Sequence, residues 1–320
     1  MSAYLPDELP GFEARPIALG RGREGDGELV ATLVRRSATR KTAGPAILYV
    51  HGFCDYFFQS FVAEAFIAAG FSFHALDLRR YGRSLRKKNL PNFVASLDEY
   101  FFELTCALEA IEAEQGGPVV ILAHSTGCLS SLLYAKRGRR RDLVQGLILN
   151  SPFLEFAVKP ALRKPLRAIA ALGARLPRVR LPLGLGGTYG RTLHRSMDGE
   201  WDYDLKKKPL KGFPVRAGWI RAIVEAQTEV RRGLHLPLPV LLMHSARSYP
   251  PGGPVTPEAH LADAVLDVED MKRIGPSIGP LVELAAIEGG KHDLFLSRKE
   301  PRELAIETAV RFAQGIVDGV

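Results

Sequence analysis

The chain has 320 residues, of which 46% are hydrophobic and 24% are charged. This length suits two average domains or one large α/β domain, and the composition excludes a disordered or collagen-like chain. No apolar run approaches the roughly 18 residues that a membrane-spanning helix needs. Because the N-terminal stretch has no signal-peptide pattern and the three cysteines form no CxxC pair, we expect a cytoplasmic protein without a disulfide framework.

Basic residues outnumber acidic ones by 43 to 35, which gives a net charge of +8. The excess is concentrated in residues 154–232, which contain 17 Lys or Arg and 7 Asp or Glu. This segment is either a solvated face, or a surface that attracts anionic substrates or an anionic membrane, or a nucleic-acid site. We expect no nucleic-acid partner, because the segment has no helix-turn-helix, zinc motif or aromatic platform.

Apolar runs alternate with helical patterns along the chain. Residues 16–20 and 27–36 are typical of a hairpin at a sheet edge. Continuous apolar runs, typical of strands that are buried on both faces of a parallel sheet, follow at 46–50, 71–78, 119–125, 147–151, 240–245 and 282–287. Helices are predicted at 58–70, 96–117, 126–136 and 301–317. This alternation predicts an α/β fold with a doubly wound, mostly parallel sheet.

The alternation stops after Ser151. Six prolines between residues 160 and 214 interrupt short amphipathic pieces. We therefore predict a core in two parts, residues 1–151 and 235–320, with a helical cap inserted at residues 152–234. The glycines near Tyr189 do not form a GxGxxG motif, and the chain has no HxxxH or HExxH pattern, so we expect neither a cofactor nor a metal site.

The most informative motif follows the apolar run at 119–124. Ser125 stands between this run and an apolar helix, with Ala123 and Gly127 two positions to either side. A serine at such a strand–turn–helix corner takes up strained backbone geometry that lifts its hydroxyl above the sheet, and small neighbours let the strand and helix approach. Alanine replaces the first glycine of the usual GxSxG pattern. Ser125 could merely cap the helix, but this context favours a nucleophile.

Four stretches occur in the order and spacing of an α/β-hydrolase. They are HGFCDYFFQSF (51–61), ALDLRRYGRS (75–84), AHSTG (123–127) and GGKHDLFLS (289–297). The chain resembles the branch of this superfamily that contains monoacylglycerol lipases, lysophospholipases and serine-aminopeptidase-like proteins. The resemblance covers about residues 28–316, closely in the sheet motifs and loosely in the cap. It implies the α/β-hydrolase fold, hydrolytic activity and a Ser-His-Asp triad.

A serine nucleophile needs a neutral imidazole to accept its proton and a carboxylate to orient that ring. His292 lies between the last strand and the final helix, where this family has its base; the alternative is a surface loop histidine. The acid is expected after residues 240–245, where an insertion rich in Pro and Gly delays the first carboxylates. Asp263 matches the family position, Asp267 is its rival, and Glu258 is a remote third. All three could instead be solvated on an amphipathic helix.

An oxyanion hole needs two backbone N–H groups that point at the developing negative charge. Thr126, at a helix N-terminus, is expected to supply one. Resemblance to the family's HG-x motif implies that Phe53 supplies the other. Asp55 is expected to hold this loop or to be a plain turn residue. His51 and His124 flank the site at the ends of strands, and each is interpreted as a residue that supports the site or packs against it.

Aromatic residues of the cap could line an apolar acyl pocket or form the cap's own small core. They include Phe153, Phe156, Trp201 and Trp219. The sequence as a whole predicts a serine hydrolase that cleaves small carboxylic esters, such as a monoacylglycerol or a lysolipid, through an acyl-enzyme. The alternatives are a serine peptidase that releases N-terminal residues from short peptides, and a non-catalytic ligand-binding protein on the same scaffold.

Overall fold

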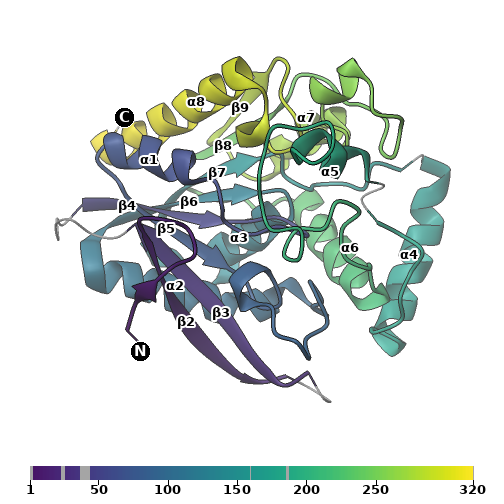
Figure 1. Cartoon of the computed structure of the whole chain (residues 1–320), viewed down its shortest axis with the longest axis horizontal. Coiled ribbons are helices and arrows are strands. Elements are labelled where there is room, and N and C mark those ends of the chain that lie inside the picture. Colours follow the sequence, from purple (N-terminus) through teal and green to yellow (C-terminus); the bar gives the residue numbers. More distant parts are fainter. Residues whose placement is uncertain (1–2, 23–25, 37–43, 159, 185–186, 320) are drawn as a thin grey trace.

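The computed structural model describes residues 3–22, 26–36, 44–158, 160–184 and 187–319. Within these residues the centre of the molecule is a nine-stranded sheet with the order β1-β2-β3-β5-β4-β6-β7-β8-β9 (Figure 1). The strands are β1 (Leu5–Pro6), β2 (Phe12–Arg21), β3 (Glu28–Arg36), β4 (Gly44–Val50), β5 (Ser72–Asp77), β6 (Gly116–His124), β7 (Val144–Asn150), β8 (Val240–Ser245) and β9 (Val282–Ile287).

The sheet is antiparallel at one edge and parallel elsewhere. β1, β2 and β3 pair antiparallel, and β3 pairs antiparallel with β5. From β5 across to β9 all neighbouring strands run parallel. The predicted fold class and the N-terminal hairpin are therefore confirmed. The prediction that residues 282–287 are buried on both faces is wrong, because β9 is the edge strand and Leu284 is 43% exposed.

Helices cover both faces of the sheet (Figure 1). Side chains of α1 and α8 pack in one apolar cluster, and those of α2 and α3 pack in the other. The helices of this core are α1 (Ser60–Ala68), α2 (Phe101–Gln115), α3 (Thr126–Arg137), α7 (Val268–Ile274) and α8 (Lys299–Asp318). This arrangement buries the parallel strands on both sides, as their continuous apolar runs require.

The predicted helix at 96–117 is divided at its start. Ser96 caps a 3₁₀ turn (Leu97–Tyr100) through a capping box with Glu99, and α2 follows directly. Gly116 ends α2 with a left-handed φ of 67°, and the chain passes at once into β6. Only glycine adopts this conformation without steric cost, so the turn from α2 into β6 is short.

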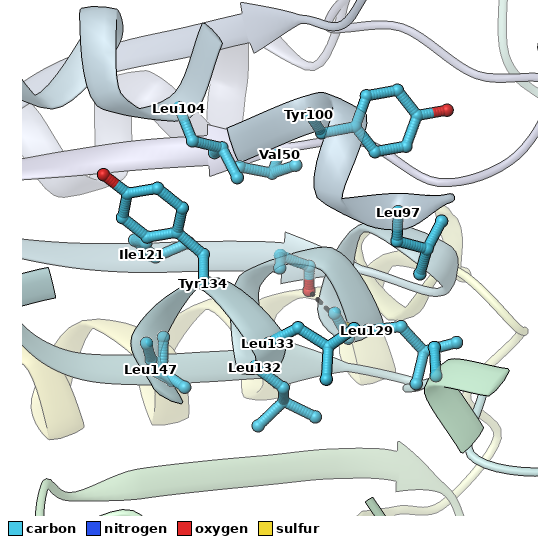
Figure 2. Close-up of a cluster of buried hydrophobic side chains, with 14 of the residues drawn as sticks. Val50, Leu97, Tyr100, Leu104, Ile121, Leu129, Leu132, Leu133, Tyr134 and Leu147 are labelled. Carbon is cyan, nitrogen blue, oxygen red and sulfur yellow. Dashed lines mark hydrogen bonds between the residues drawn. The ribbon is translucent and has the colours of Figure 1, made fainter. Parts of the chain in front are cut away.

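Large apolar side chains fix α2 and α3 on the sheet. Figure 2 shows Leu104 of α2 beside Val50 and Tyr134 of α3 beside Ile121, and Leu129 of α3 belongs to the same apolar cluster. All five are buried. Burying one leucine side chain contributes about 1.5–3 kcal/mol. Packing of this kind sets the position of α3, and therefore of the corner at its N-terminus.

The segment between β7 and β8, where the sequence predicts a cap, contains further helices. Its helices are α4 (Pro160–Arg175), α5 (Thr188–Leu193) and α6 (Ala217–Arg231). α4 lies along α6, and they approach so closely that a β-carbon on Gly173 would lie 2.3 Å from the carbonyl oxygen of Ala217. The segment lies beside the carboxyl-terminal ends of the central strands (Figure 1). None of the helices in the described residues is both long and apolar enough to cross a bilayer.

Candidate active site

The corner after β6 has the strained geometry that the motif predicts. Ser125 has φ 51° and ψ −113°, in a region that L-residues rarely adopt. A β-carbon on Gly127 would lie 2.4 Å from the carbonyl oxygen of His51 and 2.6 Å from that of Val50. Gly127 is therefore needed for α3 to approach β4. The Ser125 hydroxyl makes no hydrogen bond that caps α3, so the structure does not support the capping interpretation.

Three polar side chains from distant parts of the chain meet at this corner. Oγ of Ser125 lies 3.0 Å from Nε2 of His292, and Nδ1 of His292 lies 2.9 Å from Oδ2 of Asp263. All three residues are buried. A carboxylate only accepts hydrogen bonds, so the proton of the neutral ring lies on Nδ1 and leaves Nε2 free to accept from the hydroxyl. This is the tautomer that a general base requires.

Backbone pairing brings Asp263 to this position. After β8 the chain runs outward through the Pro/Gly-rich insertion and returns beside its own start. Asp263 donates its N–H to the carbonyl of Arg247 (2.9 Å) and accepts from the N–H of Tyr249 (2.7 Å). Its Oδ1 accepts from the N–H groups of Val265 and Leu266, both at 2.8 Å. The carboxylate is therefore held from both sides.

The two other candidate acids lie elsewhere. Asp267 caps α7 by accepting from the N–H of Glu269 at 3.1 Å. Glu258 is exposed and accepts a hydrogen bond from the hydroxyl of Thr256. Neither contacts His292 among the described residues. The geometry thus distinguishes Asp263 from its rivals, as the family position implied.

Asn150 and Asp293 hold the loop that carries His292, and the sequence analysis identified neither. Oδ1 of Asp293 accepts from the side-chain amide of Asn150 at 2.8 Å, and Asn150 accepts from the N–H of Leu294 at 3.2 Å. Tyr189 of α5 accepts from the N–H of Asp293 at 3.2 Å. The sequence signal that could have identified Asn150 is the position of its side-chain amide at the carboxyl end of a parallel strand, β7.

The two residues predicted as oxyanion donors lie beside Ser125. Within the described residues, the N–H groups of Phe53 and Thr126 donate to no protein acceptor, and both residues line the cavity that contains Ser125. Gly52 lies against the corner, since a β-carbon there would approach the β-carbon of Ser125 to 3.0 Å. The loop after β4 therefore packs directly on the end of β6 and on Ser125.

Hydrogen bonds at both ends of this loop fix its course. Nε2 of His51 accepts from the N–H of Leu78 at 3.0 Å, so its Nδ1 carries the proton and donates to the carbonyl of Gly52 at 2.8 Å. Burial lowers the pKa of His51 and keeps the ring neutral. At the other end, the N–H of Phe57 donates to Asp77 at 3.0 Å. His51 thus has a structural role.

Asp55 accepts a hydrogen bond from Lys208, a residue that no sequence motif marks. Its Oδ1 lies 2.5 Å from Nζ of Lys208, and both side chains are buried. Burial alone would raise the pKa of Asp55, but the Lys208 ammonium holds it below its ordinary value. Asp55 is therefore an ionised carboxylate that a cap residue neutralises. Lys208 ends a run of three lysines, and nothing in the run marks the third.

One group of side chains has the composition of a metal site. Asp55, His124 and Asp293 each place a possible ligand atom within 4.8 Å of the others. The groups already have partners, however: Lys208 on Asp55, and amide donors from Asn150 and others on Asp293. An ammonium beside the carboxylate would repel a divalent cation. We assign no metal to this group.

A cavity of about 300 Å³ opens above Ser125. Its walls are mostly apolar and include the predicted Phe153, Phe156 and Trp219, with Tyr203. Trp201 does not line it, so that prediction is wrong. Its indole stacks on Phe61 and donates to the carbonyl of Leu296, because the chain after α5 turns this side chain toward the core.

Comparisons with known proteins agree with this fold. The family model described as "Hydrolase_4: Serine aminopeptidase, S33" matches residues 42–248. The structure is similar to a soluble variant of monoglyceride lipase from Saccharomyces cerevisiae in complex with a substrate analog (TM-score 0.67, 16% identity, 94% of this chain and 97% of that chain). It is also similar to monoacylglycerol lipase from Paleococcus ferrophilus (TM-score 0.65, 18% identity, 90% and 99%). A third similar structure is a thermophilic esterase from Thermogutta terrifontis (TM-score 0.58, 17% identity, 95% and 99%). No curated protein matches the chain.

The corner predicts a strong effect of one added methyl group. Gly127→Ala is expected to lower the free energy of unfolding by about 1–3 kcal/mol, because the new β-carbon collides with two backbone carbonyls. Urea unfolding followed by circular dichroism measures this. The matched control is Gly315→Ala in α8, where the added carbon meets nothing within 4 Å beyond its chain neighbours and the backbone of its own helix; it is expected to add about 0.5–1 kcal/mol. Equal effects at the two sites would contradict the role given to Gly127.

Proposed function

Because the chain belongs to the Hydrolase_4 (serine aminopeptidase) family, we propose that it is a serine hydrolase that cleaves small carboxylic esters through an acyl-enzyme. The observation that carries the proposal is the hydrogen-bonded line from Ser125 through His292 to Asp263. This line starts inside a largely apolar cavity. The catalytic roles below follow from that geometry and from general acyl-transfer chemistry.

In the acylation step, Oγ of Ser125 attacks the acyl carbonyl while Nε2 of His292 takes the hydroxyl proton. The carbonyl oxygen becomes an oxyanion, which the N–H groups of Phe53 and Thr126 bind at the N-terminus of α3. One such donor is worth about 10²–10³ in kcat. The C–O bond to the alcohol then breaks, and His292 gives its proton to the leaving oxygen.

In the deacylation step, a water molecule attacks the acyl-enzyme and gives its proton to Nε2 of His292. The carboxylate of Asp263 keeps the imidazole in the tautomer with the proton on Nδ1 and stabilises the imidazolium that forms in each step. Return of the proton to Ser125 releases the carboxylic acid. The chemistry uses side chains, backbone N–H groups and water.

The lining of the cavity supports an acyl substrate. The walls above Ser125 are formed mainly by aromatic and aliphatic side chains, including Phe153, Phe156 and Trp219. Such a surface favours an alkyl or aryl acyl group through apolar burial. We therefore propose esters of the monoacylglycerol or lysolipid type as the substrate class.

A peptidase that releases N-terminal residues is the second candidate, since the family description names a serine aminopeptidase. Such an enzyme needs a carboxylate to bind the free amine of the substrate. Among the described residues, Asp55 is the one carboxylate that lines the cavity. Lys208 already neutralises it at 2.5 Å, which favours the esterase.

The proposed triad predicts a specific ranking of variants. Ser125→Ala and Asp263→Asn are each expected to lower kcat by about 10³-fold or more, because the first removes the nucleophile and the second disrupts the imidazole tautomer. Hydrolysis of p-nitrophenyl butyrate by the folded variants measures this.

Asp267→Asn is the matched control, because Asp267 caps α7 and does not touch His292; its kcat is expected to stay close to the wild-type value. Wild-type turnover in Ser125→Ala would refute the proposal. A fluorophosphonate probe that fails to label Ser125 in the wild type would instead favour a ligand-binding protein.

Substrate preference is predicted to follow the cavity. p-Nitrophenyl esters with acyl chains of graded length are expected to have a higher kcat/KM than aminoacyl amides, because the walls are apolar and Asp55 is paired. Steady-state kinetics on both series measures the preference. A higher kcat/KM for aminoacyl amides would favour the peptidase.

The outer side of the cap supports a transient association with anionic membranes. Leu172, Leu176 and Val179 are 41–52% exposed, and the exposed Arg175 and Arg180 lie among them in the chain. Apolar and cationic side chains in this combination favour the interface of an anionic bilayer.

We expect more protein to sediment with phosphatidylglycerol vesicles than with phosphatidylcholine vesicles. The double variant Leu172→Ser with Leu176→Ser should reduce this binding, whereas Leu304→Ser, on the exposed surface of α8, should not. Equal binding to the two kinds of vesicle would contradict the proposal.

A further inference from the structure

The cap holds the loop that carries the oxyanion N–H of Phe53. Four consecutive residues of this loop each contact the cap, and the contacts below run in opposite directions along the two segments. The pairs are Phe53 with Trp219, Cys54 with Phe213, Asp55 with Lys208, and Tyr56 with Asp204. We call this set of contacts the staple.

The central pair of the staple is a buried ion pair. Nζ of Lys208 lies 2.5 Å from Asp55 and packs over the rings of Phe58 and Tyr203, at 5.4 and 5.6 Å from their centroids. Among the described residues, Asp55 is the carboxylate that forms a salt bridge with Lys208. A buried ion pair adds little net stability to a protein, but displacement of one partner is strongly destabilising because it leaves the other charge buried and unpaired. It therefore specifies one relative position of loop and cap.

Two hydrogen bonds flank this ion pair. The N–H of Phe213 donates to Sγ of Cys54 at 2.9 Å, and the N–H of Asp204 donates to the hydroxyl of Tyr56 at 2.9 Å. Burial raises the pKa of Cys54 to about 12, so its thiol is neutral and donates to Oδ1 of Asn92 at 3.0 Å. The Cys54 side chain thus joins the loop to the cap and to the core.

The loop needs such support because its backbone is strained. Cys54 has φ 53°, a left-handed conformation that persists only where surrounding contacts over-determine it. Hydrogen bonds to Leu78 and Asp77 fix the loop near His51 and Phe57, and the staple holds the residues between them. An oxyanion donor works only within about 2.7–3.1 Å of the developing charge, so a small shift of Phe53 has a large effect.

We propose that Lys208 is a positioning residue for the reaction: through Asp55 it sets the position of the Phe53 N–H, so that the oxyanion hole is complete only while the cap segment 204–219 is docked on the loop. This inference rests on the proposed function for its catalytic part. The docking itself is independent of the chemistry.

The run of three lysines provides matched controls. Lys206 is exposed, and Lys207 pairs with Glu8. Lys208→Met removes the charge and keeps the length of the chain. Its kcat on p-nitrophenyl butyrate is expected to fall by about 10–100-fold, whereas complete loss of an oxyanion donor lowers kcat by up to about 10³-fold. Its KM is expected to change by less than about twofold. Lys208→Arg should recover most of the loss, and Lys206→Met should equal the wild type.

Hydrogen–deuterium exchange of residues 52–57 tests the docking without any substrate. Exchange should be faster in Lys208→Met than in the wild type or Lys206→Met. Lys208→Met could fail to fold because Asp55 is left unpaired, and two further variants cover that outcome. The double variant Asp55→Asn with Lys208→Met removes both charges, and Tyr56→Phe removes one flanking hydrogen bond. Each is expected to change kcat and exchange in the same direction as Lys208→Met.

A folded variant with wild-type kcat and wild-type exchange in residues 52–57 overturns the inference. A wild-type protein without esterase activity overturns the proposed function, while the exchange measurement still decides whether Lys208 docks the cap on the loop. Faster exchange together with unchanged kcat also overturns the positioning role, because the loop would then move without effect on catalysis.

Discussion

The backbone corner at Ser125 is the constraint on which the rest of the site depends. Its positive φ costs about 1–3 kcal/mol, and contacts on every side offset that cost. The N–H of Ser125 donates to Asn150, and its carbonyl accepts from Phe153. Gly127 lies against the carbonyls of Val50, the last residue of β4, and His51. The ends of β4, β6 and β7 are thereby joined at one point, which fixes where the hydroxyl stands.

Rigid loops bring the other groups to this point. Asp263 is held by backbone pairing beside the end of β8, and His292 by the network of Asn150 and Asp293. Each carboxylate oxygen of Asp263 has a partner before any substrate binds. In the proposed mechanism, such preorganisation means that little reorganisation is needed when charge develops on the imidazole. The loop after β4 differs, because part of its support comes from the cap.

Local patterns in the sequence were sufficient for the parts of the site that one segment encodes. The strand, corner and helix around Ser125 follow from an apolar run and two small residues, and the family position distinguished Asp263 from Asp267. Lys208 could not be identified from local patterns, because only its tertiary contacts distinguish it from the two lysines before it. Trp201 was wrongly assigned to the cavity wall for the same reason. An aromatic side chain in a cap can face the cavity or the core, and the periodicity of short segments interrupted by proline does not show which of the two it faces.

The charge excess of residues 154–232 also has a different meaning in three dimensions. Two of its cations neutralise acids that lie outside the segment: Lys207 pairs with Glu8, and Lys208 with Asp55. Composition assigns these charges to a basic cap and an acidic core, yet across the interface they cancel. Opposite charges on two segments favour one docking geometry over others. Part of the basic excess therefore helps to dock the cap on the core, and only the remaining cations, such as Arg175, contribute to the electric field outside the protein.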